Sequence, residues 1–137
     1  MSSTLDVHIL SIPLPDTAND WQGDTKIANL FRAPTAANGG GITILEAYFT
    51  NQAADGAGTA SKLFLYNYGT PGTAVSGTIG SAGGTADPWA AGVPKAFTLT
   101  AAQQLIDAGE WVVLSKDEEN SSDFTRGILT IHYIMGN

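Results

Sequence analysis

Two β-prone runs close the chain: Glu110-Trp111-Val112-Val113-Leu114-Ser115, and Gly127-Ile128-Leu129-Thr130-Ile131-His132-Tyr133-Ile134-Met135. The segment between them, 116–126, begins with a charged and polar run, Lys-Asp-Glu-Glu-Asn-Ser-Ser-Asp. β-branched and aromatic residues favour strands, and two such runs joined by a polar turn predict an antiparallel hairpin. The end of the chain therefore predicts a fold built from antiparallel sheet.

The second of these runs is apolar on both of its faces. Alternation places Leu129, Ile131, Tyr133 and Met135 on one side and Ile128, Thr130, His132 and Ile134 on the other. A strand of this kind is expected inside a sheet and covered on both sides. We therefore expect it to be a central strand of a β-sandwich.

Similar patterns predict further strands upstream. They fall at 4–12, 42–50 and 61–68, with shorter ones near 73–79 and 93–99. The segment 26–33 fits a strand or one helical turn, and Pro34 favours the strand because the residue before a proline prefers extended geometry. Pro13 and Pro15 are expected to end the first strand, since proline cannot donate to a ladder.

Two of these strands show which side chains should share a face. In 42–50 the drier face is expected to carry Thr43, Leu45, Ala47 and Phe49. In 61–68, one face is expected to carry Phe64, Tyr66 and Tyr68, and the other Leu63 and Leu65.

One short helix is predicted at 101–108. Thr100-Ala101-Ala102-Gln103 has the spacing of a capping box, and Gly109 can provide a left-handed C-terminal cap. Short strands, Gly/Pro turns and one helical turn together predict an all-β antiparallel β-sandwich of jelly-roll type.

The length of 137 residues suits one domain. The triglycine 39–41 reads as a hinge that divides the chain into two parts. We expect 1–38 to form an N-terminal strand, arm and loop, either part of the main domain or swapped onto a neighbour. The β-sandwich domain is expected at 39–137.

Composition excludes several classes of partner. The net charge is −7 and the six basic residues are spread along the chain, whereas binding to nucleic acid needs clustered Lys and Arg. Apolar runs stay well short of the ~20 residues that cross a bilayer, and the N-terminus shows no signal peptide, so no membrane partner is expected. Charged residues make up only 14% of the chain, which is more typical of an assembly subunit than of a cytosolic enzyme.

No arrangement of residues predicts catalysis. Asp6 and His8 share a strand face, but the sequence has no cysteine and no serine in a nucleophile elbow. We expect His8 and His132 to be structural or surface residues and the protein to have no catalytic residue. It is accordingly not predicted to be an enzyme.

Metal and cofactor sites are not predicted either. The acidic turn 117–123 and the residues Asp16, Asp20 and Asp24 lack the spacing of a calcium loop, so solvated loops are expected. Gly39-Gly40-Gly41 precedes a strand, whereas a phosphate-binding glycine loop follows one and opens a helix.

Three tryptophans need packing partners because an exposed indole is costly. Trp111 is expected in the core. Trp21 and Trp89 lie in expected loops, where each either plugs one end of the sandwich or contacts another subunit or a sugar.

The closing runs resemble a known class of protein. The segments 98–100, 107–114 and 127–133 resemble the end of small tailed-bacteriophage virion proteins with β-sandwich or jelly-roll folds, and 40–48 is similar to the opening core strand of that class. The resemblance implies a capsid decoration (cement) protein on the virion surface, made in the bacterial host cytoplasm. It implies the major capsid protein as partner and a homo-oligomer, with a trimer as the expected state.

Such a protein would bind by burying apolar residues and by adding strands at sheet edges. The interface candidates are Leu5, Val7, Ile9, Trp21 and Trp89. The alternative is a receptor- or carbohydrate-binding module of a head fibre or tail, with Trp89, Tyr66 and Tyr68 stacking on sugars.

Overall fold

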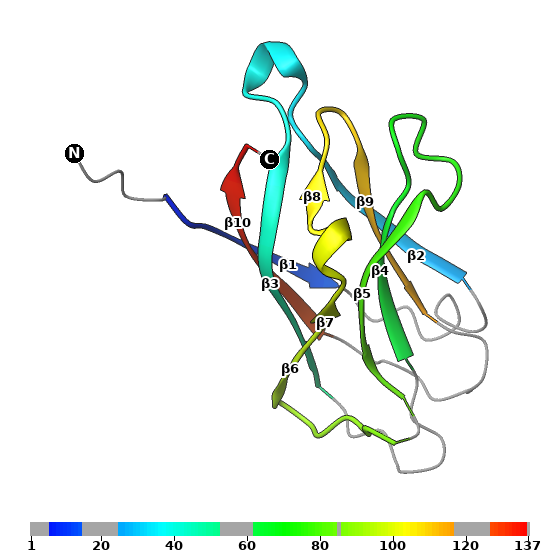
Figure 1. Cartoon of the computed structure of the whole chain (residues 1–137). Helices are drawn as coiled ribbons and strands as arrows, with labels where there is room; N and C mark the ends of the chain where they lie inside the picture. Colours follow the sequence, from blue (N-terminus) through cyan, green and yellow to red (C-terminus); the bar gives the residue numbers. More distant parts are fainter. Residues whose placement is uncertain (1–5, 15–24, 53–61, 85, 117–126, 137) are drawn as a thin grey trace.

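The structure is a computed structural model that describes residues 6–14, 25–52, 62–84, 86–116 and 127–136, with only the backbone described for 25–29. Two five-stranded sheets face each other as a sandwich (Figure 1). Sheet A has the order β1 (His8–Leu14), β10 (Gly127–Met135), β3 (Ile42–Asn51) and β6 (Pro94–Ala96), and β8 (Leu105–Ile106) also pairs with β3. Sheet B has the order β2 (Thr25–Arg32), β9 (Trp111–Lys116), β4 (Lys62–Asn67), β5 (Gly77–Gly83) and β7 (Thr98–Leu99).

Every strand pair in the described sheets is antiparallel. Most successive strands alternate between the sheets: β1 is in sheet A, β2 in sheet B, β3 in sheet A and β4 in sheet B. After β5 the chain returns to sheet A with β6, and it ends with β9 in sheet B and β10 in sheet A. This arrangement is a double-sheet jelly roll, so the predicted fold class is confirmed.

The inner faces of the two sheets make one apolar core. β3 and β10 contribute from sheet A, and β4 and β9 contribute from sheet B. The side chains of this core that are fully buried include Ile44, Phe49, Leu63, Leu65, Ile79, Ile106, Val112, Leu114, Leu129 and Ile131. The predicted separation of Leu63 and Leu65 from Phe64 and Tyr66 on opposite faces of β4 is confirmed, and the two leucines are buried.

The predicted terminal hairpin is wrong. β9 lies between β2 and β4 in sheet B, whereas β10 lies between β1 and β3 in sheet A. Each run needs two strand neighbours, and placing them in opposite sheets lets both contribute apolar side chains to the same core. Figure 1 shows the two strands on different sides of the sandwich.

The predicted helix at 101–108 is also wrong. Ala101–Gln103 forms one 3-10 turn, η2, and Thr100 makes no side-chain cap. The chain then becomes β8, because the backbone of Ile44 donates to Gln104 O at 2.9 Å and Gln104 Nε2 donates to Ile44 O at 2.8 Å. Pairing with β3 thus replaces the helical hydrogen bonds. The other 3-10 turn in the described part is η1 (Ala36–Asn38), which leads to Gly39 and Gly40, both at positive φ.

Three strand details differ from the sequence expectation. In β3, Leu45 has no partner in the pairing with β10, so a bulge puts Thr43 and Leu45 outside while Ile42 and Ile44 point inward. Pro13 does not end β1, which continues to Leu14 as an edge strand. The predicted strand at 93–99 is divided at the buried Phe97, where the chain passes from β6 in sheet A to β7 in sheet B.

The strand prediction for 26–33 is confirmed by β2, and the short strand expected near 73–79 begins later, at Gly77. The N-terminal segment is integrated into both sheets, since β1 pairs with β10 and β2 pairs with β9.

Candidate binding surfaces

The outer face of sheet A is the surface that points away from the core. The strand register aligns Ile9, His132 and Glu46 in one row, and Pro13, Ile128 and Thr50 in another. Large apolar side chains remain exposed here, with Ile9 at 65% and Ile128 at 41% of their full exposure. This face also carries Ser11, Thr43, Leu45, Tyr48, Pro94, Ala96, Leu105, Thr130 and Ile134.

This finding corrects the expectation that β10 is covered on both sides. Leu129 and Ile131 are buried between the sheets, but Ile128 and its neighbours on the other side of β10 face solvent in the single chain. A central strand with an uncovered apolar face makes this the first candidate binding surface of the molecule.

Glu46, Tyr48 and His132 form a polar cluster within that face. Tyr48 Oη donates to Glu46 Oε2 at 2.8 Å, and His132 Nδ1 lies 3.5 Å from the same oxygen. The rings of Tyr48 and His132 are 5.9 Å apart. The hydrogen bond to Glu46, together with desolvation and the charge of that carboxylate, raises the pKa of Tyr48 above its ordinary value. A shallow pocket beside this cluster is lined by Tyr48, Thr50, Pro94, Thr130 and His132.

The predicted interface residues have different positions. Ile9 lies on the outer face of sheet A, and Val7 is exposed just before β1. Leu5 and Trp21 lie outside the described residues.

Of the two roles expected for Trp89, packing within the sandwich is confirmed and its place among the interface candidates is corrected, because only 2% of it is exposed. Its indole packs edge-on against Phe49 at 5.6 Å, with Lys95 Nζ 5.5 Å from the ring centre. A side chain held in this way is core and presents no surface to a subunit or a sugar. The sequence predicts Trp111 in the core, but it is half-buried on the outer side of sheet B, where Gly72 packs against its ring.

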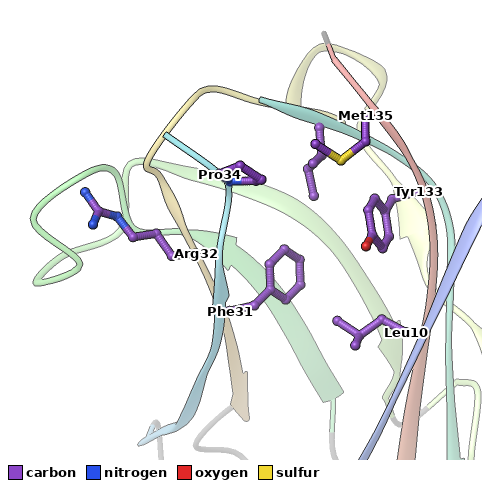
Figure 2. Close-up of a pocket in the computed structure, with 7 residues that line it drawn as sticks. Leu10, Phe31, Arg32, Pro34, Tyr133 and Met135 are labelled. Atoms are coloured by element: carbon purple, nitrogen blue, oxygen red, sulfur yellow. The ribbon is translucent and has the colours of Figure 1, made fainter. Parts of the chain in front are cut away.

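A second candidate site is a pocket of about 190 Å³ near one end of the sandwich. Figure 2 shows it between β1 and β10 on one side and β2 on the other. Leu10 and Phe31 point toward each other across it, and the side chain of Arg32 turns away. Its lining residues are Leu10, Phe31, Arg32, Pro34, Ile42, Tyr133 and Met135.

A third candidate is an aromatic row on the outer face of sheet B. The rings of Phe64 and Tyr66 are stacked, with 5.4 Å between their centres and 4° between their planes. The centres of the Tyr66 and Tyr68 rings are 6.4 Å apart. Lys62 Nζ lies 5.5 Å from the centre of the Phe64 ring at one end of the row. These residues alternate with the buried Leu63 and Leu65, so their half-buried rings belong to the outer surface.

The expectation that Asp6 and His8 share a strand face is wrong. β1 begins at His8, which leaves Asp6 outside the strand, and His8 stacks on Tyr133 at 5.2 Å. The acidic turn 117–123 and Asp16, Asp20 and Asp24 lie outside the described part of the chain. In the part that is described, no three His, Asp or Glu side chains cluster as metal ligands would, and no helix is long and apolar enough to span a membrane.

Sequence reasoning did not find the contact between Glu46 and His132 or the pocket. The contact and the pocket each bring together residues from strands that are distant in the sequence. Neither can be predicted until the pairing of those strands is known. The detectable signal is the apolar character of both faces of β10, which predicts burial on both sides, whereas one side is exposed.

Comparison with known proteins adds no assignment: neither the scan against models of protein families nor the search of curated proteins finds a match to this chain.

Proposed function

We propose that this chain is a structural protein of a bacteriophage particle that binds the outer surface of the capsid and stabilises the head. It performs no catalysis. Its partner is the major capsid protein, and the outer face of sheet A is the contact surface. The observation that carries the proposal is that β10, a central strand, keeps Ile128 exposed on the same outer face as the exposed Ile9 of β1.

Physical considerations support this choice of surface. Apolar area removed from water stabilises a complex by roughly 25 cal/mol per Å², and an assembly contact needs such area without any reactive group. The polar cluster of Glu46, Tyr48 and His132 adds directional hydrogen-bonding groups within the same face. Together these features place apolar side chains and polar groups on one face, and protein interfaces combine both kinds of contact.

The fold and the sequence resemblance support the same proposal. Jelly rolls occur in viral capsid proteins and in lectin domains, and a fold alone does not assign a function. The resemblance of the closing strands to small phage virion proteins favours the capsid. It also carries the proposal of a homo-oligomer, a trimer, which light scattering of the purified protein measures directly.

Capsid binding by surface variants tests the proposal. Ile9→Glu and Ile128→Glu each place a charge on the outer face of sheet A, whereas Val75→Glu places one on a similarly exposed apolar residue of a loop in another part of the molecule. Cosedimentation with empty expanded capsids of the phage that carries this protein is expected to be lost with the first two variants and retained with the third. Equal binding of all three variants would remove the outer face of sheet A as the capsid contact.

The aromatic row of sheet B favours a second candidate, a receptor- or carbohydrate-binding module. Half-buried aromatic rings on an outer sheet face provide apolar surface against which a sugar ring can pack. In this candidate Tyr66 and Tyr68 contact the glycan together with Phe64, and the buried Trp89 does not. Glycan binding that is lost in Tyr66→Ala and unchanged in Ile128→Glu would favour this module over the capsid protein.

A further inference from the structure

The pocket of Figure 2 lies on a different surface from the proposed capsid contact. It is located where the edge strand of each sheet borders the gap between them: β1 is the edge of sheet A, and β2 is the edge of sheet B. Leu10 comes from β1, Phe31 from β2, and Tyr133 and Met135 from β10. The sandwich is therefore open to a ligand at this place.

Nearly all of the pocket lining is apolar. Leu10, Phe31, Pro34, Ile42 and Met135 provide aliphatic and aromatic walls. The guanidinium of Arg32 is directed elsewhere, because its Nε donates to Gly109 O at 2.8 Å. The walls therefore select an apolar group.

Tyr133 provides a polar atom in this lining. Figure 2 shows its hydroxyl end turned toward the space between Phe31 and Leu10. Its ring is stacked on His8 at 5.2 Å, and no residue in the described ranges forms a hydrogen bond with its hydroxyl. A phenol hydroxyl both donates and accepts, so a ligand in the pocket can use it in either direction.

The volume limits the size of the ligand. An apolar cavity of about 150 Å³ lined by Leu, Ile and Phe is large enough to bind benzene. The volume of about 190 Å³ here holds one six-membered ring with a small substituent. A fused-ring system or a long acyl chain is too large to be enclosed.

We propose that the pocket binds one phenol-like group, an apolar six-membered ring whose hydroxyl or carbonyl forms a hydrogen bond with Tyr133. This group belongs either to a free small molecule or to a tyrosine side chain of a polypeptide. The chemistry is the same in both cases, and it is independent of capsid binding because it uses the inner face of β10 and not the outer face.

Calorimetric titration of the full chain with phenol and with benzene tests the pocket. Phenol is expected to bind with one site per chain and more tightly than benzene. Tyr133→Phe is expected to weaken the binding of phenol about two- to tenfold, which is the contribution of one hydrogen bond. The affinity for benzene is expected to stay unchanged. Absence of phenol binding would overturn the proposal, and equal phenol binding by Tyr133→Phe would overturn the role of the hydroxyl.

A filling variant tests the location of the site. Met135 is partly exposed at the pocket, so Met135→Trp can block the space without adding volume to the core. Leu105→Trp is the matched control, because Leu105 is similarly exposed but lies on the outer face of sheet A. Phenol binding is expected to be lost in the first variant and kept in the second, and its survival in Met135→Trp would contradict the assignment to this pocket.

A second pair of probes distinguishes the two sources of the group. N-acetyltyrosinamide and a short extended peptide with one central tyrosine both carry the phenol ring. Tighter binding of the peptide indicates that backbone pairing with a free strand edge contributes, and therefore a polypeptide source. Equal binding of the two probes indicates a free small molecule, and binding of neither would contradict the proposal.

Discussion

Gly127 is the residue at which β10 enters sheet A, opposite Leu14 of β1 and Asn51 of β3. A Cβ at this position would collide with the ring of Phe49, which is fully buried and packed against Trp89. Overpacking of a core costs about 1–3 kcal/mol. We therefore expect Gly127→Ala to lower the free energy of unfolding by about this amount, measured by urea denaturation.

Gly77→Ala is the matched control for that substitution. Gly77 also lies in a strand, but the atom its Cβ would meet is the end of the Gln103 side chain, which is flexible and only half-buried. Since Gln103 can rotate away, the loss of stability is expected to be clearly smaller. Equal destabilisation by the two substitutions would mean that the fit against Phe49 is not what requires a glycine at position 127.

Tyr48 allows a prediction about titration. Its pKa is raised first by the hydrogen bond to Glu46, then by desolvation and by the negative charge of the same carboxylate. Glu46→Ala removes two of these three causes, so the pKa of Tyr48 is expected to fall toward its ordinary value. Titration followed by tyrosinate absorbance measures this pKa, and comparison with Tyr48→Phe identifies the signal of Tyr48. An unchanged pKa of Tyr48 in Glu46→Ala would contradict the contact between Tyr48 and Glu46.

β1 has one face that packs in the core and another that belongs to the proposed contact surface. Leu14 points into the core and is buried, whereas Ile9 points outward and is exposed. Leu14→Ala is expected to destabilise the fold by about 2–4 kcal/mol, and Ile9→Ala by no more than ~0.5 kcal/mol. Thermal unfolding measures both effects.

Capsid binding is expected to show the opposite order when folded protein is compared: Ile9→Ala weakens it and Leu14→Ala leaves it unchanged. If Leu14→Ala lost capsid binding and Ile9→Ala kept it, as their effects on stability are ordered, Ile9 would make no direct contact with the capsid. These single substitutions are a sharper test than removal of 1–24, because that truncation also deletes β1 and exposes the edge of β10.

The sequence predicted which residues form strands better than which strands pair with each other. Alternation in 61–68 correctly separated the buried Leu63 and Leu65 from the aromatic face, because β4 is regular on that side. In 42–50 the same reasoning failed at the bulge of Leu45, since one unpaired residue reverses every later side chain.

The pairing of strands could not be obtained from local patterns. The polar segment between β9 and β10 predicts a hairpin. The two strands instead lie in opposite sheets, where each pairs with two neighbours and both contribute apolar side chains to the same core. The helix prediction at 101–108 failed for a related reason: hydrogen bonds between Gln104 and Ile44 favour pairing with β3 over a helical turn. Ile9 could be proposed as an interface residue from its position in a β-prone run, whereas the pocket could not be predicted because its lining residues come from four separate segments.

The whole molecule combines a net charge of −7 with an outer face of sheet A that is mainly apolar and hydroxyl-bearing. Glu46 is the acidic residue that the register places in this face, and its carboxylate oxygen already contacts Tyr48 and His132. Binding through such a surface should depend on burial of apolar area more than on attraction between charges. The acidic character of the chain would then serve solubility and not docking.

Salt distinguishes these two modes of binding to the capsid. The screening length falls from about 30 Å at 0.01 M salt to about 3 Å at 1 M, so an association driven by surface charge weakens steeply over this range. Burial of apolar area is instead strengthened by sulfate. We expect cosedimentation with capsids to persist at high sodium chloride and to increase in sodium sulfate, with Ile128→Glu defective at every salt concentration. Release of the wild-type protein by salt would show that charged groups, and not the exposed face of β10, hold it on the particle.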